Sequence, residues 1–124
     1  SIPPGEKSRY HAAAVVASNF PAVLLSIGER LLAATGVPEQ VAGRALRPLF
    51  HAAAENLRGR TAADALTGPI VRGDVETVRR HLVSLAGDPD ALGVYVALSR
   101  AAIPVALAAG ADGGRLEEIE ELLR

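Results

Sequence analysis

Glycine and proline residues divide this sequence into long stretches rich in alanine and leucine, and this division is the strongest constraint on the fold. The stretches lack the alternation of β-branched and polar residues that is typical of strands, and the glycines and prolines do not stand at hairpin spacing. Alanine and leucine have favourable intrinsic helix propensities. The sequence therefore predicts an all-α fold.

The first half is expected to form two long helices, over about residues 8–34 and 38–58. Each contains an internal proline, which removes a backbone N–H and clashes with the preceding turn. Pro21 is expected to kink or split the first helix near Asn19, and Pro48 is expected to bend the second.

The second half is expected to form four shorter helices. Thr61, Asp74 and Asp90 have side chains that accept hydrogen bonds from the first amides of a helix, so each is expected to cap one. The last helix is amphipathic, and its apolar face needs a surface to pack against. The expected helices cover about residues 61–65, 74–85, 90–105 and 114–124.

Several kinds of chemistry are disfavoured by what the sequence lacks. Without cysteine, the chain has no disulfide, thiol nucleophile or thiolate metal site. The three histidines lie on three different expected helices and lack the spacing that places two metal ligands on one helical face. The net charge is −1 and the two signs are interspersed, so no basic face is available for nucleic acid.

The chain is expected to be cytoplasmic and to have no membrane partner. Its uninterrupted apolar runs are well below the roughly 20 residues that cross a bilayer, and its first residues lack the pattern of a signal peptide. The chain has no methionine, so we expect that residue 1 is not the start of the gene product. Residues 1–6 are expected to be a linker or disordered segment before a single helical domain, residues 7–124.

A polar stripe stands out on the first expected helix. Between Tyr10 and Phe20, the only strongly polar side chains are His11, Ser18 and Asn19. At about 100° per residue, His11 and Ser18 lie within ~20° of each other, and Asn19 flanks them. Two interpretations are open. The stripe lines a ligand cleft, or its side chains satisfy buried partners or simply face solvent.

Several segments of the sequence together resemble the helical half of the "Rossmann-like and domain of unknown function 2520" family. The segments are residues 10–14, 18–20, 55–57, 65–74 and 95–100. The most specific is the Leu-Thr-Gly-Pro-Ile-x-Arg-Gly-Asp run at 66–74, and the similarity extends over about residues 7–105. The resemblance implies a nucleotide-binding Rossmann domain, absent from this chain, followed by this helical domain.

The resemblance also implies a fold and an activity. The fold would be a helical bundle similar to the C-terminal domain of 6-phosphogluconate dehydrogenase, and also to those of ketopantoate reductase-like and pyrroline-5-carboxylate reductase-like enzymes. In those relatives the helical domain closes the substrate cleft and commonly forms the homodimer. The implied activity is NAD(P)-dependent oxidoreduction of a small molecule, with ketopantoate reductase-like chemistry as the closest analogy.

Hydroxyacid dehydrogenases of this superfamily use a Lys-x-x-x-Asn pair on the first long helix, and this sequence matches only half of it. Asn19 matches the asparagine, but Val15 stands in the lysine position. The only lysine, Lys7, is ~18 Å from Asn19 along a straight helix, so it cannot replace the missing one. Either His11 supplies the titratable group, or the family carries out a different reaction or none.

The expected site follows from the resemblance and the polar stripe together. Asn19 and His11 are the expected catalytic residues, and Ser18, Asn56 and Thr67 the expected substrate-binding residues. NADP or NAD would be held by the Rossmann domain of the same polypeptide. The chain alone is expected to bind neither, because it has no Gly-x-Gly-x-x-Gly motif after a strand.

Two other functions remain open. One is a non-catalytic dimerising module attached to a nucleotide-sensing Rossmann domain. The missing lysine favours that alternative, whereas the polar stripe favours the enzyme. The other is a free-standing helical interaction domain, which would require the gene to begin near residue 1.

Overall fold

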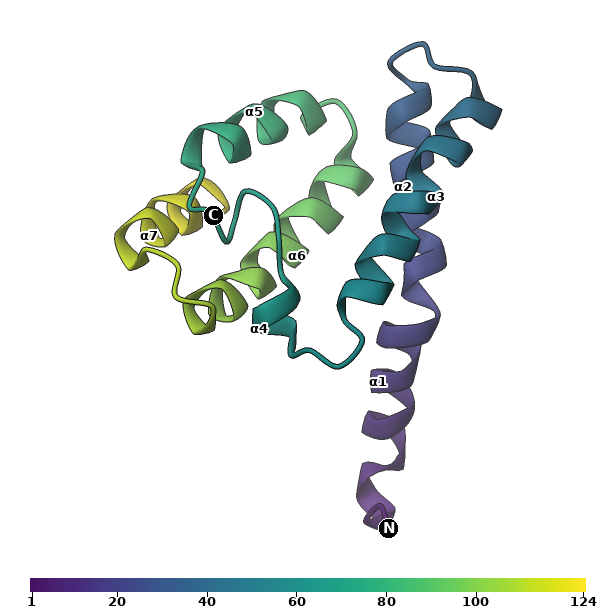
Figure 1. Ribbon diagram of the computed structural model, residues 1–124, viewed down its shortest axis with the longest axis vertical. Helices are drawn as coiled ribbons and strands as arrows, with labels where there is room; N and C mark the ends of the chain where they lie inside the picture. The colour runs from purple at the N-terminus through teal and green to yellow at the C-terminus, as the bar shows by residue number, and fades with distance from the viewer. The chain divides into compact units, whose positions relative to one another are not determined.

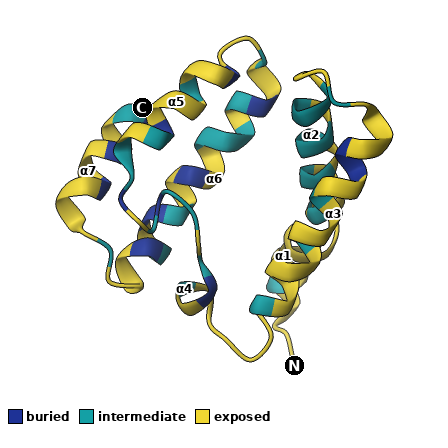
Figure 2. Cartoon of the chain, turned by 45° about the horizontal axis from the view of Figure 1, so that its top comes forward, coloured by how far each residue is buried: buried dark blue, intermediate teal, exposed yellow.

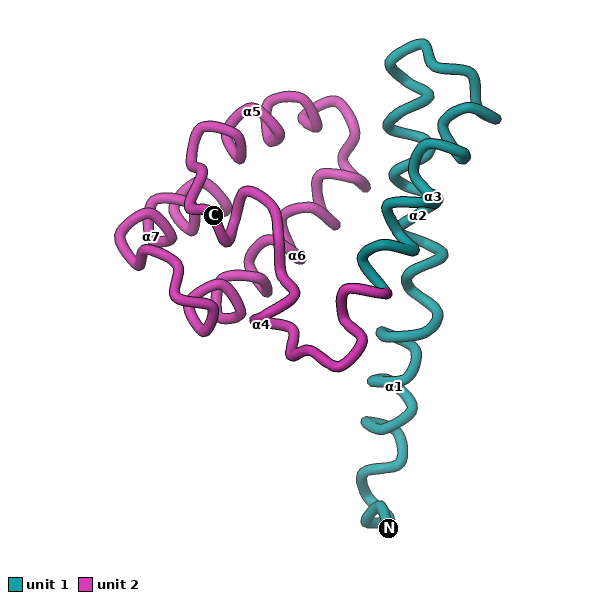
Figure 3. Tube along the Cα trace, in the orientation of Figure 1, with its two compact units in different colours: residues 1–54 teal, residues 55–124 magenta.

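The computed structural model describes all 124 residues, and its regular structure is entirely helical, as the sequence predicts. It contains seven α-helices and one short 3₁₀ helix, η1 (Pro4–Glu6), without strands (Figure 1). The chain divides into two compact units, residues 1–54 (unit 1) and residues 55–124 (unit 2), which Figure 3 colours separately. Each unit is described by itself.

Unit 1 begins with two helices that follow each other directly, α1 (Lys7–Ser18) and α2 (Phe20–Ala33). The expected split at Asn19 is therefore confirmed. Asn19 keeps a right-handed helical backbone and its N–H donates to the Val15 carbonyl over 2.9 Å, so α2 continues in nearly the direction of α1 (Figure 1). The split follows from Pro21, which lacks an N–H for the Ala17 carbonyl.

The chain then reverses, and α3 (Glu39–Asn56) returns alongside α2 (Figures 1 and 2). Gly36 permits the reversal, because its φ of 99° lies in the left-handed region that favours glycine. The two helices approach closely at Gly28, where an added Cβ would lie 3.3 Å from the Leu46 side chain. α3 runs through Pro48 without interruption.

Unit 1 has almost no buried core of its own. Its buried residues are Ala42 and Gly43, and α1 and α2 have none (Figure 2). Several large apolar side chains are exposed instead: Ile2, Tyr10, Val16, Phe20, Val23, Val41 and Leu49. Burial of apolar surface is the main favourable term in folding, so unit 1 gains little of it from its own helices.

Unit 2 contains the hydrophobic core of the chain. It is formed by α5 (Val75–Leu85), α6 (Pro89–Ala108) and α7 (Gly113–Leu122), which pack against one another, and by the loop that follows α4 (Ala62–Ala65). The buried cluster consists of Ile70, Val78, Ile103, Ala106, Leu116, Ile119 and Leu123. α7 is amphipathic as expected, and the surface that covers its apolar face lies on α5 and α6 of the same unit.

Side-chain caps begin the helices of unit 2, and one of the three expected caps was wrong. Thr61 and Asp74 cap α4 and α5 as predicted. α6 is capped by Asp88, which accepts from the Ala91 N–H over 3.1 Å, rather than by Asp90. The reason is Pro89, whose fixed φ suits the first helical position and starts the helix before Asp90.

By length and composition alone, two helices are long and apolar enough to cross a membrane. They are the continuous helical segment Pro4–Ala33 and α6. Neither helix has an uninterrupted apolar run of that length, because polar residues such as His11 and Ser18 interrupt the first of them. Core helices of soluble proteins pass the same test, and α6 contributes Ile103 and Ala106 to the core of unit 2.

Candidate functional site

The polar stripe predicted on the first helix lies on exposed surface. His11 is in the middle of α1, and Ser18 is two turns later on the same face. His11 makes no hydrogen bond or ion pair within the chain. Seven residues of helix separate its Cα from that of Ser18 by about 10 Å, so the two side chains cannot hold one ligand atom together.

Ser18 and Asn19 are brought together at the junction of α1 and α2. The Ser18 hydroxyl donates to the Ala14 carbonyl oxygen over 2.5 Å, and its Oγ also lies 3.4 Å from Asn19 Oδ1. A hydroxyl has one proton, so the shorter bond to the helix backbone takes it. Ser18 can therefore offer a ligand only an acceptor. The Asn19 side-chain NH₂ has no partner within the chain and can offer donors.

Asn56 and Thr67 belong to unit 2, where they have different surroundings. Asn56 Nδ2 donates to the Ala65 carbonyl over 2.9 Å, and its Oδ1 accepts from Arg60 Nη1. The NH₂ group and the oxygen of the Asn56 side chain are thus both hydrogen-bonded, and they stabilise the loop between α3 and α4. Thr67 is exposed in the loop that follows α4, and its hydroxyl is not hydrogen-bonded within the chain.

The segment 66–74, the most specific part of the sequence resemblance, forms a turn with clear structural requirements. Gly68 and Gly73 have φ values of 100° and 63°, and an added Cβ at Gly73 would lie 3.0 Å from the Arg115 side chain. Ile70, between them, is buried in the core. This segment therefore fixes the approach to α5, which accounts for its residue pattern without a ligand.

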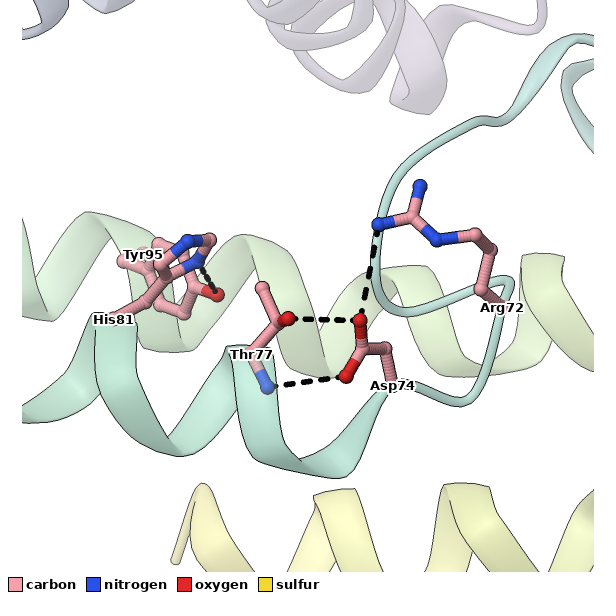
Figure 4. Close-up of polar contacts among 5 residues, drawn as sticks. All are labelled: Arg72, Asp74, Thr77, His81 and Tyr95. Carbon is pink, nitrogen blue, oxygen red and sulfur yellow. Dashed lines mark hydrogen bonds and ion pairs between the residues drawn. The ribbon is translucent and has the colours of Figure 1, made fainter.

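Asp74 ends the turn and makes several polar contacts at the start of α5 (Figure 4). One carboxylate oxygen accepts from the Thr77 N–H over 3.1 Å, and the other accepts from the Thr77 hydroxyl over 2.7 Å. Arg72 Nη2 lies 4.0 Å from the second oxygen. The pKa of Asp74 is lowered below its usual value of 3.8, chiefly by the Thr77 hydroxyl and then by the Thr77 N–H.

A contact between His81 and Tyr95 joins α5 to α6 and was not predicted from the sequence. His81 Nδ1 lies 2.9 Å from the Tyr95 hydroxyl, with the two rings edge to face at 89° (Figure 4). Burial raises the pKa of Tyr95, against the opposing effect of a hydrogen bond with Ser99. The phenol therefore stays protonated near neutral pH and acts as a hydrogen-bonding link between two helices.

Two hollows lie between α2 and α3 of unit 1, and Arg47 lines both of them. The polar hollow is about 410 Å³ and is lined by Glu29, Glu39, Gln40, Gly43, Arg44 and Arg47. The apolar hollow is about 270 Å³ and is lined by Pro21, Ala22, Leu25, Arg47, Phe50, His51 and Ala54.

None of the predicted site residues lines either hollow. The available sequence signal was the spacing of Arg44, Arg47 and His51, which places the three basic side chains along one face of a helix.

The fold defines an all-helical domain in which the exposed polar side chains of α1 and the hollows along α3 are the candidate binding surfaces. A family model described as "Domain of unknown function (DUF2520)" matches residues 1–102, so the chain belongs to this family. The match ends within α6, before α7. No curated protein and no solved structure shows significant similarity to the chain.

Proposed function

We propose that this chain is the substrate-cleft and dimerisation domain of an NAD(P)-dependent oxidoreductase, with a bundle like the C-terminal domain of 6-phosphogluconate dehydrogenase. The observation that carries the proposal is the pair Ser18 and Asn19 at the junction of α1 and α2. This pair is exposed on the consecutive helices α1 and α2, whose other residues are mostly apolar. Because ligand sites are concave and bury most of the ligand, the proposal assigns the other wall of the cleft to the Rossmann domain of the same polypeptide.

In this proposal the Asn19 side-chain NH₂ donates a hydrogen bond to the reacting carbonyl or imine group of a small substrate. Ser18 adds an acceptor beside it, since its proton is committed to Ala14. His11 contacts another part of the ligand or transfers a proton through water, because it is too far along α1 to reach the same atom. The chemistry is analogous to that of ketopantoate reductase.

The residues of this chain do not fit a dinucleotide. Binding of the pyrophosphate in such enzymes needs a glycine-rich turn between a strand and a helix, and this chain has no strand. The proposal therefore places NADP or NAD on a Rossmann domain of the same polypeptide, with the roles of Asn19 and His11 limited to holding the substrate and its protons.

Dimerisation is the second part of the proposal, and an exposed apolar seam of unit 1 supports it. Val16, Phe20, Val23 and Ile27 follow one another at spacings of four, three and four residues, which is typical of a helix that packs against another helix. Val16, Phe20 and Val23 are 60%, 47% and 52% exposed. At 100° per residue the seam lies roughly opposite Ser18 and His11, so a second copy could cover it and leave those two side chains free, with Asn19 at the edge of the interface.

A second function is favoured by one observation, the valine at position 15. An apolar side chain there leaves Asn19 without the basic partner found in hydroxyacid dehydrogenases. The chain would then be a non-catalytic dimerising module beside a nucleotide-sensing Rossmann domain. The experiment that separates the two is oxidation of NADPH by the full-length protein against a panel of small keto acids and imines. Turnover of any of them supports the enzyme, and cofactor binding without turnover supports the sensor.

A further inference from the structure

The apolar hollow of unit 1 has a mostly apolar lining to which two polar side chains, Arg47 and His51, also contribute. Pro21, Leu25 and Phe50 are partly buried and form its apolar lining, together with Ala22 and Ala54. Arg47 and His51 line the same hollow from α3, four residues apart, so their side chains lie on one face of the helix one turn from each other. No acidic residue lines this hollow.

The donors of both side chains are available to a ligand. Arg47 Nη2 lies 3.8 Å from Glu29 Oε1, which is an ion pair but is longer than a hydrogen bond. The guanidinium therefore keeps its N–H donors free, and it is 66% exposed. His51 makes no hydrogen bond or ion pair within the chain, and a neutral imidazole still carries one N–H donor. A carboxylate in this hollow can therefore accept hydrogen bonds from the Arg47 guanidinium and from the His51 imidazole one turn away.

The hollow suits a small ligand. Its volume is about 270 Å³ and it is open to solvent, so at about 30 Å³ for each water-sized group a ligand of roughly nine non-hydrogen atoms fits within it, and a larger ligand could extend beyond it. An inorganic anion could accept hydrogen bonds from Arg47 and His51, but it would leave the apolar lining of the hollow exposed to water. A neutral hydrocarbon would cover the apolar lining but would leave the N–H donors of Arg47 without an acceptor, because Glu29 lies beyond hydrogen-bond distance.

We propose that this hollow is a binding site for a small organic carboxylate with a branched apolar tail. The carboxylate is bound by Arg47 and His51, and the tail packs on Leu25 and Phe50. The hollow also lies beside the proposed substrate site, because Ala22 and Leu25 follow Ser18 by four and seven residues on the same helical face. Binding there does not depend on nicotinamide chemistry, so it can be tested separately from the proposed function.

The test is an NMR titration of the ¹⁵N-labelled 124-residue chain with 4-methylpentanoate, which has eight non-hydrogen atoms. The uncharged 4-methylpentanamide and inorganic phosphate are titrated in parallel. The proposal expects saturable shifts at the amides of residues 21–25 and 47–54 with the carboxylate, and at least tenfold weaker binding of the other two. Equal binding of the amide, tighter binding of phosphate, or no saturable shift at these residues would overturn the proposal.

Arg47→Gln is the matched test of the charge, since an exposed glutamine keeps hydrogen-bonding capacity and removes the positive charge. It is expected to weaken 4-methylpentanoate binding at least tenfold, and Arg47→Lys to restore part of it. Arg44→Gln is the control, because Arg44 lies one turn away on α3 and lines only the polar hollow. Its effect should stay within twofold. Equal losses from Arg44→Gln and Arg47→Gln would mean that general charge, and not this hollow, attracts the anion.

Discussion

Asp74 and Thr77 are joined by two hydrogen bonds at the start of α5, one from the Thr77 N–H over 3.1 Å and one from its hydroxyl over 2.7 Å. The first satisfies an amide that the helix itself leaves unpaired, and the second holds the carboxylate in place. Since α5 contributes Val78 to the core of unit 2, this cap links the turn at 66–74 to the packing of the helices.

Asp74→Ala is expected to lower the stability of the fold measurably, because it removes the N-cap acceptor of α5. Thermal melting of the 124-residue chain measures the effect. The control is Asp90→Ala, since Asp90 lies in the first turn of α6 but does not cap it, and its loss should cost clearly less. If Asp74→Ala leaves melting unchanged while the full-length protein loses activity, Asp74 is a functional residue and its role as a cap is minor.

The stabilisation by the Asp74 cap should also depend on pH. Because the pKa of Asp74 is lower in the folded chain than its usual value of 3.8, the ionised carboxylate stabilises the fold above pH 3.8. That contribution is lost as the pH falls below 3.8 toward the folded-state pKa. The melting temperature of the wild type minus that of Asp74→Asn should therefore be larger at pH 6 than at pH 3. A difference that is constant across this range would contradict the assigned pKa shift.

These caps and helix breaks were predictable because their causes lie within a few residues. Pro21 lacks the N–H for one carbonyl of its own helix, and Asp74 accepts from an amide three residues ahead. The Asp88 cap was predictable in principle as well, since Pro89 marks the first position of α6. Asp90 stands after the proline that starts the helix, so it lies inside the first turn and cannot be the cap.

The hollows and the contact between His81 and Tyr95 depend on packing between helices, which leaves no local signal. His81 and Tyr95 are fourteen residues apart, and only the turn between α5 and α6 brings their side chains together. Arg47 and His51 share a helical face that the sequence shows, but Leu25 completes the hollow from another helix. The polar stripe was predictable as a stripe. That the Ser18 hydroxyl proton is already donated to the Ala14 carbonyl became visible only in the structure.

Self-association through the seam on α1 and α2 should give a dimer. Light scattering after gel filtration at tens of micromolar is expected to yield about twice the 12.8 kDa mass of the chain. The double variant Val16→Lys with Phe20→Lys should be monomeric, because it places two charges in the proposed interface. Val83→Lys is the control, since Val83 is 73% exposed on α5 of unit 2. A wild type that elutes as a clean monomer would count against the interface.

The roles of Asn19 and His11 can be separated from structural roles by measuring melting and turnover together in the full-length protein. Asn19→Ala removes the NH₂ that has no partner within the chain, so a substrate-binding role predicts a loss of turnover of at least tenfold with little change in melting. His11→Ala should behave in the same way with a smaller loss, because His11 contacts a different part of the ligand. Ser84→Ala is the control, since Ser84 is an exposed serine on α5 of unit 2 and belongs to neither α1 nor α2.

Ser18 adds a sharper test to this set, because its proton is committed to the Ala14 carbonyl over 2.5 Å. If Ser18 offers the substrate only an acceptor, Ser18→Ala should weaken substrate binding less than Asn19→Ala does, and it should leave the fold intact. A serine hydroxyl bonded to the preceding turn slightly destabilises and bends a helix, so its removal should not lower the melting temperature. A large drop in melting for Asn19→Ala or His11→Ala would instead show that the first helix needs these side chains for its own packing. In that case the polar stripe would be structural, and the catalytic proposal would have no residue to carry it.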